Sequence, residues 1–152
     1  EEMVESGIEP TNLYLSLYGP DKETYENVTR PLVADVWERI GASLKLMPAF
    51  RESRTIVRLT LIKGQNMHDP EGYSKLVMEG APSVLELKGY SWLGESKQRL
   101  PISAMPYQSE IREFAKKMEK TTGYELVAED TVSRVAVLSC GGSTRGLSLD
   151  AQ

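Results

Sequence analysis

The stretch TIVRLTLIK, residues 55–63, decides how the rest of the sequence is interpreted. Every second residue is valine or leucine, and between them lie Arg58 and Thr60. This two-residue period is typical of a β-strand, and Gly64 ends it. Because the polar side chains share one face, the strand has one apolar face for a core and one face that meets water or a ligand.

The same alternation appears on both sides of this strand. Residues 12–18 (NLYLSLY) carry leucine on one face and tyrosine or serine on the other, and residues 83–90 (SVLELKGY) oppose leucine to Glu86 and Lys88. Two shorter segments, 125–128 and 135–139, also have strand composition. The sequence therefore predicts five strands.

Helical signals lie between these strands. The three- and four-residue spacing of apolar side chains after Asp35 predicts a helix that ends at Pro48. Asp21 and Asp69 are expected to cap two further helices, the second with proline at its first position. A helix is also expected from Ser109 to about residue 122, and the first seven residues resemble the end of another. Residues 91–105 are expected to form a long structured loop.

Strands that alternate with helices favour right-handed crossovers and parallel pairing. We therefore predict the α/β class, as the C-terminal portion of a partial (β/α) barrel with mainly parallel strands and covering helices. A complete eight-fold barrel takes about 250 residues. We expect one domain over residues 1–140 and a disordered polar tail over 141–152. The alternative is a flat antiparallel sheet with one solvated face, which alternation predicts equally well.

The composition excludes several classes of protein. The chain has 152 residues and a formal net charge of -4, without an apolar run of the roughly 18 to 20 residues that span a membrane or a basic, apolar leader. We expect a soluble cytoplasmic protein with no membrane partner. One cysteine, Cys140, and one histidine, His68, cannot supply a disulfide, a zinc site or an iron-sulfur cluster, and both are expected to be structural.

Two cations on the polar strand faces need partners. Arg58 or Lys88, buried alone, would cost several kcal/mol, so each requires Glu86, a ligand carboxylate or a phosphate. A structural pair between Arg58 and Glu86 is the alternative. Lys63, at a strand end beside Asn66, is well placed for a ligand anion, although a loop lysine is most often only solvated.

The segment KGYSWLGESKQRL, residues 88–100, combines cations with aromatic rings. Aromatic faces can stack on exposed bases while cations contact phosphates, as in recognition of single-stranded RNA. The alternative is a surface loop whose aromatic side chains pack inward.

Five runs of the sequence carry a family resemblance. They are PTNLYLSL (10–17), RPLVADVWERIGASLKLM (30–47), RTIVRLTLIKGQNM (54–67), LELKGYSWLGESKQRL (85–100) and MPYQSEIREFA (105–115). In order and spacing they resemble the C-terminal half of the radical S-adenosylmethionine tRNA 4-demethylwyosine synthases of archaeal type. The resemblance covers about residues 8–140.

The resemblance implies an enzyme that uses S-adenosylmethionine and a [4Fe-4S] cluster. Members of that family condense pyruvate carbons with N1-methylguanosine at position 37 of phenylalanine tRNA to form 4-demethylwyosine. By analogy, residues on strands facing the cofactor are Ser16, Arg58, Thr60 and Asn66. Those expected to contact substrate or tRNA are Lys63, Lys88, Tyr90, Trp92, Lys97 and Arg99, mostly within a wyosine-specific region of about residues 85–115.

The chain departs from the family pattern at several points. The cluster-binding cysteine motif and the catalytic lysine expected nearer the N-terminus are absent, so we expect an N-terminal half in cis or in trans and no activity from this chain alone. The family's Asp-Ala pair is Tyr18-Gly19, which removes a carboxylate, and the usual histidine is Gln108. The alternative function is a stand-alone, degenerate binding or regulatory module without catalysis.

Overall fold

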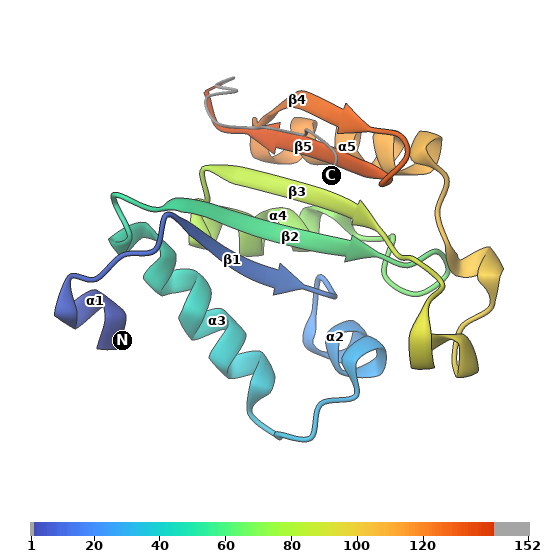
Figure 1. Ribbon diagram of the computed structural model, residues 1–152, viewed down its shortest axis with the longest axis horizontal. Helices are drawn as coiled ribbons and strands as arrows, with labels where there is room; N and C mark the ends of the chain where they lie inside the picture. Colours follow the sequence, from blue (N-terminus) through green and yellow to red (C-terminus); the bar gives the residue numbers. More distant parts are fainter. Residues whose placement is uncertain (1, 142–152) are drawn as a thin grey trace.

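Five strands form one mixed sheet in the order β1-β2-β3-β5-β4 (Figure 1). The computed structural model describes residues 2–141. The strands are β1 (Asn12–Leu17), β2 (Arg54–Leu61), β3 (Val84–Gly89), β4 (Glu125–Asp130) and β5 (Val135–Ser139). β1, β2 and β3 run parallel, whereas β5 is antiparallel to both β3 and β4.

The helices begin where the sequence places their caps. They are α1 (Glu2–Ser6), α2 (Lys22–Thr29), α3 (Val36–Leu46), α4 (Pro70–Gly80) and α5 (Gln108–Thr122). The Asp21 side chain accepts a hydrogen bond from the Thr24 amide at 2.8 Å, and Asp69 accepts one from Gly72 at 3.0 Å. Both predicted caps are confirmed. For α5 the expected start at Ser109 is wrong by one residue.

Helices α3, α4 and α5 pack on the same face of the sheet and share its main core. The alternating leucines and valines of the strands supply the other side of that core, and all of the following are fully buried: Leu17, Val57, Leu59, Leu61, Leu85 and Leu87. Burying a side chain of this kind contributes about 1.5 to 3 kcal/mol. The period-two pattern thus sets which face the helices cover. A smaller apolar cluster on the opposite face includes Ile56 and Val137.

The mainly parallel sheet is confirmed for the first three strands only. The expectation fails at β4 and β5, because the connection between them is a four-residue turn (131–134), too short for the crossover that parallel strands need. The long loop expected over residues 91–105 contains two short 3-10 helices, η2 (Gly94–Gln98) and η3 (Ile102–Ala104). A third, η1 (Met47–Ala49), extends α3 around Pro48.

The described residues include no helix with the length and apolar character needed to cross a membrane. The tail expected to be disordered lies, apart from Gly141, outside the described residues.

Candidate functional site

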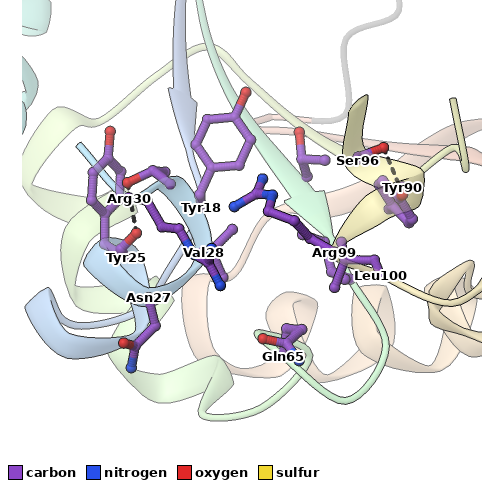
Figure 2. A pocket seen from close by; sticks show the side chains of 13 residues that line it. Tyr18, Tyr25, Asn27, Val28, Arg30, Gln65, Tyr90, Ser96, Arg99 and Leu100 are labelled. Atoms are coloured by element: carbon purple, nitrogen blue, oxygen red, sulfur yellow. Dashed lines mark hydrogen bonds between the residues drawn. The ribbon is translucent and has the colours of Figure 1, made fainter. Parts of the chain in front are cut away.

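A cavity of about 560 Å³ lies at the carboxyl ends of the parallel strands (Figure 2). Its walls come from segments far apart in the sequence: the end of β1 with α2, the end of β2, and the 90–100 segment after β3. The side chains that matter most for its chemistry are Tyr18, Arg30, Thr60, Tyr90, Ser96 and Arg99. This volume falls in the range of small-molecule sites, and the carboxyl edge of a parallel sheet is where ligands bind in open α/β folds.

Arg30 enters the cavity from the C-terminal end of α2. It adopts a left-handed conformation with φ of 49°, and its amide donates to the Glu26 carbonyl at 2.8 Å, which closes the helix. Non-glycine residues rarely adopt this conformation, and here Pro31 follows directly. The helix end therefore holds the Arg30 backbone fixed at the wall. The sequence analysis did not select Arg30, because an arginine before a proline is typical of an ordinary helix end.

Arg99 enters from the opposite wall, on a segment braced by two aromatic side chains. The Tyr90 hydroxyl donates to the Ser96 hydroxyl at 2.7 Å, and the Trp92 indole N–H donates to the Leu100 carbonyl at 2.8 Å. Figure 2 shows the Arg99 side chain reaching from this segment toward Tyr18. Arg99 was predicted to contact substrate or tRNA, and the structure brings it to the cavity.

The cavity is electropositive. The part of its lining that the described residues form contains Arg30 and Arg99 but no carboxylate. Within residues 2–141 neither guanidinium has an ion-pair partner. Two unneutralised arginines in one concave site favour an anion, since a guanidinium can donate two parallel hydrogen bonds to a phosphate or a carboxylate.

Arg58 and Glu86 face each other on the side of the sheet opposite the helices. Arg58 Nε lies 2.8 Å from Glu86 Oε1, and Nη2 donates to Oε2 at 3.2 Å. Partial burial disfavours the charged form, but the hydrogen bond and charge of Glu86 outweigh it, so the pKa of Arg58 is raised. The Arg58 guanidinium also lies 4.8 Å from the centre of the Tyr14 ring. The structural pair that the sequence left open is present, and a cofactor contact from Arg58 stays a prediction.

Ser16, Thr60 and Lys88 lie around this pair. Ser16 is opposite Arg58 in register, and Thr60 is opposite Lys88, one step closer to the strand ends. Thr60 also lines the cavity, whereas Lys88 does not. Lys88 lies near Asp130, and its charge adds to the hydrogen bonds from Ser133 that lower the pKa of that carboxyl. The polar row predicted on adjacent strands is therefore continuous with the cavity through Thr60.

Asn66 is fully buried, and its side chain is engaged by the backbone. Its Oδ1 accepts from the Ile62 amide at 2.6 Å, and Nδ2 donates to the carbonyls of Tyr18 and Thr60 at 2.8 Å each. The Asn66 side chain thus links the carboxyl ends of β1 and β2 through hydrogen bonds. Its expected contact with a cofactor stays a prediction.

Lys63 is neutralised by the start of α5 and does not line the cavity. Its ammonium lies 2.6 Å from Glu110 Oε1 and 5.4 Å from the centre of the Tyr107 ring. The hydrogen bond from Lys63, followed by one from the Tyr107 amide, lowers the pKa of Glu110. An incoming anion would have to compete with this carboxylate.

The aromatic side chains of the 88–100 segment point inward. Tyr90 is 8% exposed and packs with Ile62 and Ala104, and Trp92 lies partly buried against the same cluster. Lys97 lies 4.8 Å from the centre of the Trp92 ring. This is the loop packing that the sequence left open as the alternative to base stacking, and it leaves Lys97 and Arg99 exposed.

Among residues 2–141 no group of three or more histidine, cysteine, aspartate or glutamate side chains is arranged to hold a metal ion. Cys140, the only cysteine in the sequence, is exposed. An iron-sulfur cluster takes three or four thiolates, so the residues of this chain do not fit the role of cluster ligands.

A mixed sheet with covering helices, whose parallel strands end at a cationic cavity, defines the class of open α/β proteins, in which ligands bind at this edge of the sheet. The family described as "Wyosine base formation" matches residues 79–140. The S-adenosyl-L-methionine-dependent tRNA 4-demethylwyosine synthase of Pyrococcus abyssi is 45% identical over 139 residues, which is 91% of this chain and 40% of that protein. The human protein of the same name is 33% identical over 87% of this chain and 18% of its own length.

Two solved structures share the fold. "Structure of TYW1 with a lysine-pyruvate adduct bound" has a TM-score of 0.76 and 31% identity, covering 89% of this chain and 42% of that one. "Crystal structure of archaeal TYW1" has a TM-score of 0.70 and 30% identity, covering 91% and 42%. Over most of its length the chain is similar to the tRNA 4-demethylwyosine synthases, and it corresponds to their C-terminal part. It spans less than half the length of these relatives.

Proposed function

We propose that this chain acts as the C-terminal part of a tRNA 4-demethylwyosine synthase. In this proposal the sheet is part of a radical S-adenosylmethionine barrel, and the row from Ser16 to Lys88 faces its interior. The observation that carries the proposal is the cavity at the carboxyl ends of β1, β2 and β3, with two guanidinium groups that have no ion-pair partner in the described part of the chain. It occurs in a chain closely similar to enzymes named for this reaction.

The reaction that we assign to the complete enzyme condenses pyruvate carbons with N1-methylguanosine-37 of phenylalanine tRNA. When bound, S-adenosylmethionine and a [4Fe-4S] cluster would supply radical chemistry. The ligands of that cluster lie outside this chain, which has one cysteine. The part played by this chain is to bind and orient, through Ser16, Thr60 and the cavity walls.

The N-terminal part of the enzyme is supplied in cis or in trans, and the chain alone is inactive. The outer edge of β1 supports this view, since β1 is the first strand of the sheet and no described strand pairs with its other side. An unpaired parallel strand is a ready partner for a further strand. tRNA and pyruvate are the proposed substrates, and the cytoplasm is the proposed location.

A chimaera tests this proposal. This chain replaces the matching segment of the Pyrococcus abyssi enzyme, and the anaerobically reconstituted protein receives N1-methylguanosine-containing tRNA, pyruvate and S-adenosylmethionine. We expect 4-demethylwyosine in the nucleoside digest by mass spectrometry. The unmodified Pyrococcus abyssi enzyme is the positive control. A folded chimaera that retains its cluster but makes no product contradicts the proposal and favours a non-catalytic binding module.

A further inference from the structure

We infer that Arg30 and Arg99 form a two-arginine clamp that binds phosphate groups of the RNA backbone at the rim of the cavity. The inference rests on the proposed function, because it takes the RNA to be the macromolecule that reaches this end of the sheet. It assigns a positioning role to Arg30, a residue that no sequence pattern selects.

The clamp is held by structure on both sides of the cavity. Arg30 follows the last turn of α2, where its amide bonds to Glu26. The Arg99 amide bonds to the Ser96 carbonyl at 3.0 Å, and the next residue is fixed by the Trp92 indole. Both residues line the cavity, and Figure 2 shows them on opposite sides of it, Arg30 on the α2 side and Arg99 on the segment after β3. Two cations held at one site repel each other until an anion lies between them.

The exposure of the two arginines favours a phosphate at the rim over a ligand deep in the cavity. Arg30 and Arg99 are both exposed, whereas Tyr25 and Tyr90, which form part of the walls, are buried. The cations therefore lie at the mouth of the cavity and the rings lie below it. A phosphodiester backbone can follow such a rim while one nucleotide enters the cavity.

The charge balance of the whole chain makes this cluster distinctive. The net charge is -4, so the surface as a whole repels RNA. Binding of RNA then depends on a local cationic site. Each phosphate contact releases counterions, and for single-stranded nucleic acid the slope of log K against log salt changes by about 0.7 per contact.

The test measures binding of a fluorescein-labelled anticodon stem-loop of phenylalanine tRNA to this chain over a series of salt concentrations. We expect Arg30→Ala and Arg99→Ala each to weaken binding roughly tenfold at low salt. Each should reduce the salt slope by about 0.7, and the double variant by about 1.4. Arg30→Lys and Arg99→Lys keep the charge and should retain most of the slope, which separates charge from folding.

Arg51→Ala is the matched control. Arg51 is an exposed arginine just before β2, at the opposite end of the strand from the cavity, and its loss should leave the slope unchanged. Equal affinity and slope for the wild-type chain and the Arg30/Arg99 double variant overturn the inference, and so does an equal effect of Arg51→Ala.

Pyruvate serves as the small-carboxylate probe. If the double variant loses pyruvate binding by NMR titration while its RNA slope is unchanged, the clamp belongs to a carboxylate and the phosphate assignment is wrong. The proposed function and the clamp can fail separately. If the chimaera makes 4-demethylwyosine but the double variant has an unchanged salt slope for RNA binding, the proposed function stands and the clamp is wrong.

Discussion

The buried amide of Asn66 determines the shape of the cavity floor. It ties the ends of β1 and β2 together through the carbonyls of Tyr18 and Thr60 and the amide of Ile62. Tyr73 completes the arrangement by donating to the Asn66 carbonyl at 3.1 Å. Because buried polar groups without partners are costly, one side chain here controls several backbone groups at once.

Replacement of Asn66 by alanine should therefore destabilise the fold. The change leaves one buried amide and two carbonyls without partners, and we expect a loss of about 3 kcal/mol in the free energy of unfolding. Urea denaturation at neutral pH measures it. Gln65→Ala is the control, since Gln65 is exposed and should change stability by no more than about 0.5 kcal/mol. A midpoint equal to that of the control would show that Asn66 does not hold the strand ends.

Residue Gly19 explains part of the departure from the Asp-Ala pair expected in the family. A Cβ atom built on Gly19 would lie 2.5 Å from the backbone nitrogen of Tyr25, so alanine does not fit at this approach of α2 to β1. The Tyr18 ring meets the Tyr25 ring edge to face, with centres 6.3 Å apart. Tyr18 thus contributes an aromatic contact at the wall of the cavity.

At the scale of elements, Glu129 joins α5 to the β4–β5 hairpin. Arg112 Nε donates to both carboxylate oxygens at 3.0 Å, and Gln108 Nε2 donates to Oε1 at 3.0 Å and to the Val135 carbonyl at 3.1 Å. A neutral histidine at this position would offer one N–H donor, whereas the amide nitrogen of Gln108 offers two for these two acceptors. The pKa of Glu129 is lowered, and the hydrogen bond from Arg112 is the main cause.

Because the pKa of Glu129 is lowered, the free energy of unfolding should depend on pH. A carboxyl whose pKa is lower in the folded state stabilises the fold above its unfolded pKa, and the contribution is lost as pH falls through the folded pKa. Glu129→Gln should therefore have a lower urea midpoint than the wild-type chain at neutral pH, and the two midpoints should converge in acid. Glu125→Gln, an exposed position on the same strand, should match the wild-type chain throughout. A gap that persists undiminished in acid would contradict the electrostatic origin.

The sequence predicted the elements whose signals are local. Aspartate caps, leucine alternation and the glycine after α5 depend on neighbouring residues alone, and each is found where expected. The direction of β4 and β5 was not predictable from alternation, which is the same in parallel and antiparallel strands. The sequence did not indicate Arg30, because Arg30 and Arg99 line the same cavity only in the folded chain. A single exposed arginine also belongs to no periodic pattern.

In the molecule as a whole, the two faces of the sheet differ: one packs against helices and the other carries polar side chains. Helices α3, α4 and α5 cover one face, while the polar row from Ser16 to Lys88 lies on the other face and leads to the cavity at the carboxyl ends. The predicted row was assembled correctly because parallel strands in register place equivalent residues side by side. Its role in holding a cofactor remains a prediction.

The proposed function requires the substrate base to reach the carboxyl ends of β1, β2 and β3. Photo-crosslinking tests it most directly: an anticodon stem-loop with a photoreactive base at the modified position is irradiated with the chimaera, and the linked peptides are identified by mass spectrometry. We predict crosslinks within residues 18–30 and 90–100. Crosslinks confined to the opposite strand ends, around Glu9 and residues 51–53, would contradict the account.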